Sequence, residues 1–127
     1  MPEEKAERDL VAVIDDDDSV RESLPDLVRE FGYAVEAFGS AEEFLGHDHV
    51  DRVTCLILDI ALPGMSGPDL QLELQRRERE IPIIYITGQT DETIGPRMLD
   101  RGAAACLRKP FSEQALLEAL AAALGAR

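Results

Sequence analysis

Five short apolar runs recur along the chain, and stretches with helical spacing separate them. The runs are Leu10–Ile14, Ala34–Phe38, Val53–Leu58, Ile83–Ile86 and Ala103–Leu107. Three of them are apolar at nearly every position, whereas a strand with one face in water alternates apolar and polar residues. The pattern therefore predicts strands of a parallel sheet that is covered on both faces.

Apolar residues between the runs follow the spacing of amphipathic helices. In the first such stretch these residues are Val20, Leu24, Leu27, Val28 and Phe31. Asp and Ser residues precede them as candidate caps. Three later helix starts are also marked. Ser40 to Glu43 has the pattern of a capping box, Pro68 suits a first helical turn, and Ser112 can cap the last helix.

Two of the predicted helices contain proline. Pro25 interrupts the first one, where it should remove one hydrogen bond and bend the axis. Gly95 and Pro96 are adjacent in the stretch from Asp91 to Arg101, and both residue types disfavour a helix interior. That helix is expected to begin late, near Gly95 or beyond. Pro96 weakens it in the interior and is tolerated in a first turn.

The elements alternate in the order βαβαβαβαβα within 127 residues, which suits one domain. Such alternation implies right-handed crossovers onto a parallel sheet with helices on both faces, an α/β doubly wound fold. In sheets of this kind, ligands bind outside the carboxyl ends of the strands. The residues that directly follow the apolar runs are therefore the candidate site.

Charge and cysteine content narrow the function. The chain has 26 acidic and 13 basic residues and a formal net charge of −13, which argues against a nucleic-acid or anionic-membrane surface. No stretch suits a membrane span, and the charged N-terminus lacks a secretory apolar core, so a cytoplasmic location is expected. Cys55 and Cys106 lie inside apolar runs and are expected to be reduced, packed thiols.

Polar residues follow four of the five predicted strands. Acids at positions 15–18 follow the first run, Asp59 follows the third, Thr87 the fourth and Lys109 the fifth. Carboxylates held together repel each other, and a hard divalent cation such as Mg²⁺ relieves that repulsion. A cation, an ammonium group and a hydroxyl donor together can hold the oxygens of a phosphoryl group. Asp59 can then act as the nucleophile that accepts this group.

Each of these residues also has an ordinary structural interpretation. The acids at 15–18 could cap a helix, Asp59 could begin a turn, Thr87 could simply end a strand, and Lys109 could be a surface lysine. Their coincidence on four strand ends favours the functional interpretation. His47 and His49 lie in a polar stretch without another His or a matching Cys, and are expected to be surface histidines.

Four stretches carry a resemblance to a known family. They are "VIDDDDSVRESL", "LILDIALPGMSG", "IIYITG" and "CLRKPF". In this order they resemble the receiver domain of bacterial two-component response regulators, most closely the FixJ type. The resemblance implies a flavodoxin-like five-stranded sheet of order 2-1-3-4-5. It places the receiver at residues 9–125, after an N-terminal extension at residues 1–8.

The resemblance also implies roles for individual residues. Asp59 would accept a phosphoryl group from a sensor histidine kinase or a phosphotransfer protein. Asp15, Asp16, Asp59 and the backbone carbonyl of Ala61 would hold Mg²⁺, with Asp16 more direct than Asp15. Thr87 and Lys109 would contact phosphoryl oxygens, and family members often have a cis peptide bond after the lysine. The chain would be a signalling module that catalyses only its own phosphoryl transfer and hydrolysis.

The sequence departs from the family in a region used for signalling. Family members commonly have Tyr or Phe three residues before the lysine, where this chain has Cys106. Thr87 and Cys106 are the expected switch residues. The expected output is a change in the face formed by the fourth helix, fifth strand and fifth helix, which could also support a homodimer. The Gly95-Pro96 pair lies in that fourth helix, and Pro25 is a further departure in the first.

Two alternatives remain. The chain could be an interaction or dimerisation module that uses the receiver fold without a phosphate switch. It could also be a free-standing phosphatase with Asp59 as nucleophile. Ala61 weighs against the phosphatase, because haloacid-dehalogenase phosphatases usually have a second Asp two residues after the nucleophile.

Overall fold

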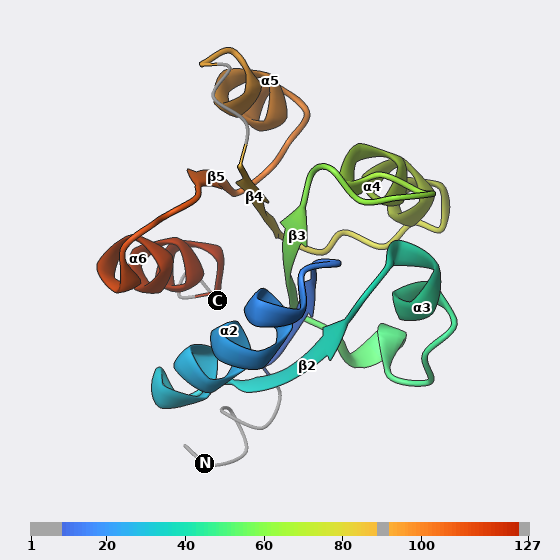
Figure 1. The fold of residues 1–127 in the computed structure, drawn as a ribbon. Helices are drawn as coiled ribbons and strands as arrows, with labels where there is room; N and C mark the ends of the chain where they lie inside the picture. The colour runs from blue at the N-terminus through green and yellow to red at the C-terminus, as the bar shows by residue number, and fades with distance from the viewer. Residues whose placement is uncertain (1–8, 89–91, 125–127) are drawn as a thin grey trace.

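The five strands form one parallel sheet of order β2-β1-β3-β4-β5 (Figure 1). The computed structural model describes residues 9–88 and 92–124. The strands are β1 (Leu10–Ile14), β2 (Ala34–Phe38), β3 (Cys55–Asp59), β4 (Ile83–Thr87) and β5 (Ala105–Arg108). The predicted order is confirmed. The predicted extension at residues 1–8, and residue 125 at the predicted end of the domain, lie outside the described residues.

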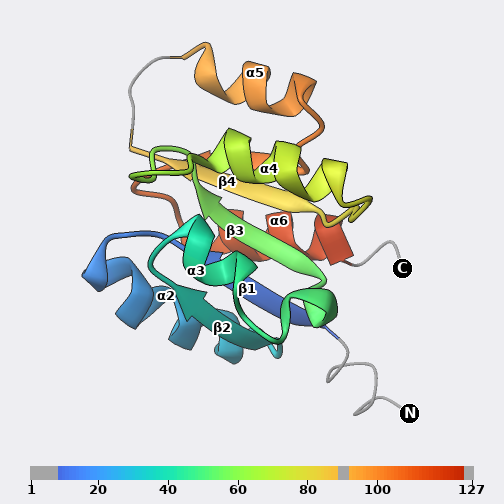
Figure 2. The same cartoon turned by 90° about the vertical axis from the view of Figure 1, so that its right-hand side faces the viewer.

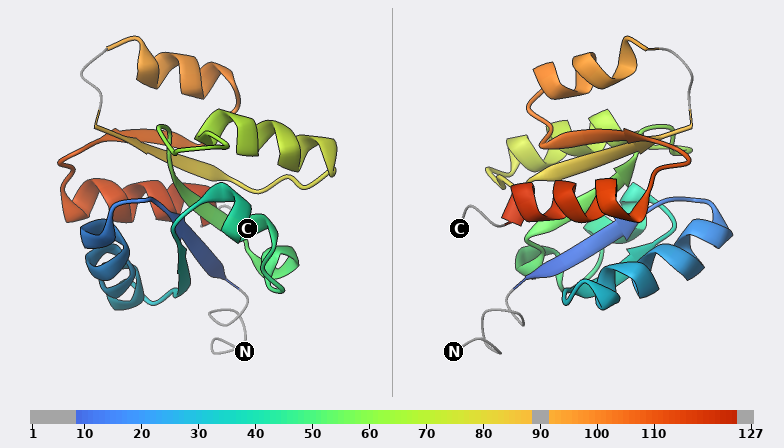
Figure 3. Two further views of the ribbon diagram at one scale, coloured as in Figure 1. Left: turned by 45° about the vertical axis from the view of Figure 1, so that its right-hand side comes forward. Right: turned by 90° about the vertical axis from the view of Figure 1, so that its left-hand side faces the viewer.

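Helices cover both faces of the sheet, as predicted. They are α2 (Asp18–Glu30), α3 (Ala41–Leu45), the 3₁₀ turn η1 (Val50–Arg52), α4 (Gly67–Arg76), α5 (Ile94–Asp100) and α6 (Glu113–Leu124). Figure 2 shows α3 and α4 in front of one face, and the right-hand view of Figure 3 shows α2 and α6 in front of the other. The helix α5 lies beside β5, at the edge of the sheet opposite β2.

The core consists of two apolar layers, one on each face of the sheet. All five residues of β1, β3 and β4 are buried. Because side chains alternate between faces, Ile14 and Tyr85 pack on the side of α3 and α4, while Val13 and Ile86 pack on the side of α2 and α6. This accounts for runs without polar alternation. Among the described residues, no helix has both the length and the apolar content needed to cross a lipid bilayer.

Two apolar runs begin earlier than the strands they predict. The strand in the run from Val53 begins at Cys55 and continues to Asp59, and the strand in the run from Ala103 begins at Ala105 and continues to Arg108. Val53 is buried and packs in the core, although it directly follows η1 and lies outside the strand. Apolar character reports burial, so residues that enter the core before pairing begins extend the run.

Side-chain caps fix the predicted helix starts. The hydroxyl of Ser40 accepts a hydrogen bond from the amide of Glu43, and the hydroxyl of Ser112 accepts one from Ala115, each at 3.0 Å. The carboxylate of Glu43 accepts from the amide of Gly39 instead of Ser40, so only half of the predicted capping box forms. Pro68 lies in the first turn of α4, as predicted.

The two helices that contain proline accommodate it differently. The helix α2 continues through Pro25, which is buried. The helix α5 begins at Ile94, near Gly95 as predicted, and Pro96 is its third residue. An amide at this position has no partner within a helix, so the proline removes no helical hydrogen bond there.

Candidate functional site

Three carboxylates meet at the carboxyl ends of β1 and β3. Asp15 and Asp16 follow β1, Asp59 ends β3, and these strands are neighbours in the sheet. Ligand oxygens of the three side chains lie within 4.8 Å of one another. Asp15 and Asp59 are buried, and Asp16 is exposed. The predicted acidic cluster therefore forms, and one member faces solvent.

Hydrogen bonds fix the orientation of Asp15. Its Oδ1 accepts from the amide of Asp17 at 2.9 Å, and its Oδ2 accepts from Nζ of Lys109 at 3.0 Å. Arg21 donates to the backbone carbonyl of Asp15 at 2.9 Å, which ties the first turns of α2 to the end of β1. Both carboxylate oxygens of Asp15 are thus engaged, one by the backbone and one by a cation.

Asp59 is held in an environment that opposes its negative charge. Burial raises the pKa of its carboxyl group, and the nearby charges of Asp15 and Asp16 add to that effect. The hydrogen bond from the Ala61 amide to Oδ1, at 3.1 Å, and the charge of Lys109 act in the opposite direction, and the net pKa is raised. A cation placed at this cluster would therefore be strongly favoured.

Lys109 supplies positive charge between two of the carboxylates. Its Nζ lies 3.0 Å from Oδ2 of Asp15 and 3.8 Å from Oδ2 of Asp59. Burial alone lowers the pKa of Lys109, but the hydrogen bond to Asp15 and the charges of Asp59 and Asp15 outweigh it, so the net pKa is raised. The side chain stays a cation. The peptide bond between Lys109 and Pro110 is cis.

Thr87 completes the set of residues predicted at the strand ends. It is the last residue of β4 and is 5% exposed. Its carbonyl accepts a hydrogen bond of 2.7 Å from the amide of Lys109. Because β4 pairs with β3, Thr87 ends at the same edge of the sheet as Asp59. The structure thus brings Thr87 and Lys109 to the edge that carries the acidic cluster.

The oxygen-rich cluster fits a hard divalent cation. Mg²⁺ prefers carboxylate, carbonyl and water oxygens, and Asp15, Asp16 and Asp59 present carboxylates at one point. Ala61 is exposed beside them, with its amide directed at Asp59. The donor set contains no sulfur or imidazole that would favour a softer metal.

Two contributors to the site escaped the sequence interpretation. Arg21 acts through the carbonyl of Asp15, and a lone arginine in a helix carries no signal for such a contact. At Gly67, a Cβ would lie 2.8 Å from the carbonyl oxygen of Asp59, so only glycine lets α4 begin this close to the acid. A glycine at a helix start, directly before a proline, is the one signal that could have indicated this approach.

Comparison with known proteins agrees with this arrangement. The family model described as "Response regulator receiver domain" matches residues 11–121. The chain belongs to this family. Receiver domains are signalling modules of bacterial two-component systems, so the resemblance found in the four sequence stretches is confirmed.

Relatives of this receiver are longer proteins. Nodulation protein W of Bradyrhizobium diazoefficiens is 47% identical over 120 residues, which are 94% of this chain and 53% of that protein. The transcriptional regulatory protein FixJ of Azorhizobium caulinodans is 41% identical over 116 residues, 91% of this chain and 54% of that protein. The chain therefore spans about half the length of these curated relatives.

Solved structures give the same result for the fold. The structure of response regulator StyR superposes with a TM-score of 0.83 at 44% identity and covers 92% of this receiver, which in turn covers 59% of that chain. The crystal structure of FixJ-N has a TM-score of 0.81 at 33% identity, covering 92% of this receiver and 94% of that chain.

The departure at Cys106 lies where the receiver pairs β4 with β5. Cys106 is opposite Tyr85 in the register, and both side chains pack on the side of α4 and α5. Cys106 is half-buried, and burial raises the pKa of its thiol. Cys55 is buried within β3. Both thiols are free, as predicted.

Proposed function

We propose that this receiver accepts a phosphoryl group on Asp59 from a phosphohistidine of a sensor histidine kinase or phosphotransfer protein, in a Mg²⁺-dependent reaction. The observation that carries the proposal is the position of the Lys109 ammonium group, 3.0 Å from Asp15 and 3.8 Å from Asp59. A cation held at this point compensates the charge of an incoming phosphoryl group. The family and the acidic cluster support the same reaction.

The transfer exchanges one bond for another. A carboxylate oxygen of Asp59 attacks phosphorus, the O–P bond forms, and the P–N bond of the donor breaks, leaving its electron pair on the imidazole nitrogen. Lys109 pairs with one phosphoryl oxygen, and the Thr87 hydroxyl donates to another. The Ala61 amide holds the attacking carboxylate in place through its hydrogen bond to Oδ1.

The divalent cation is assigned to the oxygen atoms of the acidic cluster that includes Asp59. When bound, Mg²⁺ offsets negative charge on the phosphoryl oxygens. Asp16 and Asp59, with the carbonyl of Ala61, would hold it. Asp15 would act mainly in support, because both of its oxygens already accept hydrogen bonds. The burial of Asp15 and the exposure of Asp16 agree with this division.

The consequence of phosphorylation is proposed for the face formed by α5, β5 and α6. Thr87 ends β4, which pairs with β5, so a movement of Thr87 reaches this face directly. The same face could support a homodimer. We assign residues 9–125 to the receiver and a cytoplasmic location to its reaction with a kinase. The output activity of a longer regulator belongs to segments outside this domain.

Intact mass after incubation with Mg²⁺ and phosphoramidate tests the proposal. The natural chain should gain one phosphoryl group, and Asp59→Asn should gain none. Asp51→Asn is a matched control, because Asp51 is an exposed acid in η1 that pairs with Arg79. It should be labelled like the natural chain. Failure to label under conditions that label other receivers would refute the proposal. Self-association without labelling would favour the interaction module.

A further inference from the structure

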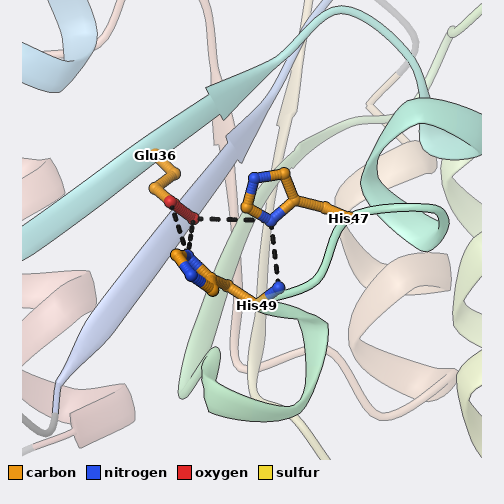
Figure 4. Close-up of side chains that lie close together, drawn as sticks. All are labelled: Glu36, His47 and His49. Atoms are coloured by element: carbon orange, nitrogen blue, oxygen red, sulfur yellow. Dashed lines mark hydrogen bonds and ion pairs between the residues drawn. The ribbon is translucent and has the colours of Figure 1, made fainter.

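A second cluster of metal-ligating side chains lies on β2, away from the acidic site. Glu36 is in the middle of β2, and His47 and His49 come from the segment between α3 and η1 (Figure 4). Nδ1 of His49 lies 2.9 Å from Oε1 of Glu36, and Nδ1 of His47 lies 3.8 Å from Oε2. The two imidazole rings thus present the same kind of nitrogen to one carboxylate.

Packing holds the two rings in this arrangement. Glu36 and Phe38 point to the same face of β2, because they are two residues apart in a strand. The ring of His47 packs edge-on against Phe38, with centroids 5.1 Å apart, and against His49 at 4.9 Å. Phe38 is itself a buried core residue. The cluster therefore has an apolar support beneath it.

The hydrogen bonds of the two rings involve the same Nδ1 atoms that would bind a metal ion. The backbone amide of His49 donates to Nδ1 of His47 at 3.1 Å, so this nitrogen carries a lone pair. Nδ1 of His49 lies 2.9 and 3.3 Å from the two oxygens of Glu36, so the ring and the carboxylate share a hydrogen bond at the position that a cation would take. Metal binding would displace the proton of that hydrogen bond.

We propose that Glu36, His47 and His49 bind a divalent transition-metal ion, with zinc the best match. Two imidazoles and one carboxylate form a common ligand set for zinc, with ligand distances near 2.0–2.2 Å, which place neighbouring ligand atoms about 3.3 Å apart. The 2.9 and 3.8 Å separations lie on either side of that value. Ligand atoms of all three residues lie within 4.8 Å of one another.

Partial exposure leaves space for the remaining ligands. The side chains of Glu36, His47 and His49 are 28%, 36% and 43% exposed, so water can complete the coordination. His47 gives up its hydrogen bond with the His49 amide when it binds the ion. The ion would join β2, an edge strand, to the segment after α3.

Ligand chemistry separates this cluster from the acidic site. Imidazole nitrogen suits zinc, nickel and copper, whereas the oxygens of Asp15, Asp16 and Asp59 suit Mg²⁺. An excess of Mg²⁺ should therefore occupy the acidic site and leave the histidine cluster available. The two clusters can be titrated one after the other in the same sample.

Histidine NMR signals give a direct test, because the untagged chain contains only two histidines. Zinc is added in the presence of excess Mg²⁺, with affinity measured by calorimetry. Both imidazoles should shift together and reach their end point at one equivalent. Glu36→Gln and His49→Gln should each weaken binding at least tenfold. Asp48→Asn, which removes an exposed charge between the two histidines, should change it less than threefold.

Three results would overturn the inference. Zinc could perturb amides around Asp59 while the histidine signals stay unchanged. Asp48→Asn could weaken binding as much as Glu36→Gln, which would reduce the effect to general electrostatics. Cys106→Ser could abolish binding, which would identify the thiol as the ligand. Loss of phosphoryl labelling at Asp59 has no bearing on any of these readouts, so the two proposals fail independently.

Discussion

The hydroxyl of Tyr85 donates a 2.7 Å hydrogen bond to the side-chain oxygen of Gln71, and both side chains are buried. The side-chain nitrogen Nε2 of Gln71 in turn donates to the backbone carbonyl of Arg101 at 2.9 Å. This pair of bonds connects β4 to α4 and then to the residue that follows α5. Thr87 lies two residues beyond Tyr85, so the connection begins beside the candidate site.

Removing the Tyr85 hydroxyl should destabilise the domain. Tyr85→Phe leaves the Gln71 oxygen without its donor inside the protein, at a cost of about 1–3 kcal/mol in the free energy of unfolding. Urea denaturation of the natural chain and the variant measures this difference in unfolding free energy. The double variant Tyr85→Phe/Gln71→Leu removes both partners and should lose less than the sum of the single variants. A loss below about 0.5 kcal/mol in Tyr85→Phe would show that this bond contributes little.

Mg²⁺ affinity should depend on Asp16 far more than on Asp18. Asp16 belongs to the acidic cluster, whereas Asp18 is the exposed first residue of α2 and pairs with Arg21. Asp16→Ala should weaken Mg²⁺ binding at least tenfold, and Asp18→Ala by much less, because only the former removes a charged ligand. Titration with Mg²⁺, followed through amide chemical shifts, measures the affinity of each variant. Equal losses would mean that the ligand is assigned to the wrong residue of the acidic run.

The helix α5 should be the least protected helix in amide exchange. Met98 is the only buried residue among its seven, whereas the shorter α3 has two buried residues of five and α6 has four of twelve. Few buried contacts and a glycine in the first turn leave its opening with a low free-energy cost. Native-state hydrogen exchange measures that cost for each amide. Protection from Thr93 onward equal to that of α6 would contradict the prediction.

Cys106 should mute the response to phosphorylation. In the family, an aromatic side chain at this position moves when the hydroxyl residue is drawn to the phosphate, whereas a small thiol exposes little different surface in either position. The natural chain should therefore show smaller amide shift changes on the face of α5, β5 and α6 than Cys106→Tyr when a beryllium fluoride phosphoryl mimic binds.

The opposite result would point to a different switch. Changes of equal size in both proteins, outside residues 91–101, would mean that Cys106 only fills space. Thr87 alone would then carry the response. Changes confined to residues 91–101 in the natural chain would instead indicate that the response travels through backbone shifts near Gly95 and Pro96.

Gly67 should tolerate no side chain. In Gly67→Ala the new Cβ would lie 2.8 Å from the carbonyl oxygen of Asp59 and 3.1 Å from Cα of Ile60, so backbone atoms must move. The expected loss is about 1–3 kcal/mol of unfolding free energy. Gly95→Ala is the matched control. Its Cβ meets nothing within 4 Å, and it should be neutral or stabilising by up to about 1 kcal/mol. Equal denaturation midpoints for the two variants would show that a side chain at position 67 causes no clash.

Sequence patterns predicted the architecture because strands buried on both faces of the sheet are apolar at nearly every position. The runs at Leu10–Ile14 and Ala34–Phe38 match their strands to the residue. Once the sheet is parallel, the residues that follow the runs must share one edge, so Asp59, Thr87 and Lys109 could be grouped without side-chain information. The strand starts predicted at Val53 and Ala103 were two residues too early, because apolar residues also enter the core outside strands.

Contacts that depend on side-chain direction could not be predicted in this way. The Lys109 bond to Asp15 joins the residues that follow β5 and β1, two strands that are not neighbours, and it requires a particular lysine conformation. Glu36 lies 11 positions before His47 in the sequence, so nothing in the local pattern pairs it with the two histidines. The alternation of side chains along β2 does place Glu36 on the face of the sheet that α3 covers. The turn that brings the two histidines to that face has no distinct sequence signal.

The position of Lys109 among the acids has a consequence for charge balance. When all groups are ionised, three carboxylates and one ammonium leave two negative charges in excess, which a divalent cation cancels. Phosphorylation of Asp59 replaces a singly charged carboxylate by a group with about two charges. Cation and phosphoryl group therefore favour each other's presence, and thermodynamic linkage requires that the two effects be equal. As the free Mg²⁺ concentration is lowered, the phosphorylated chain should therefore retain its cation at concentrations where the unmodified chain has lost it.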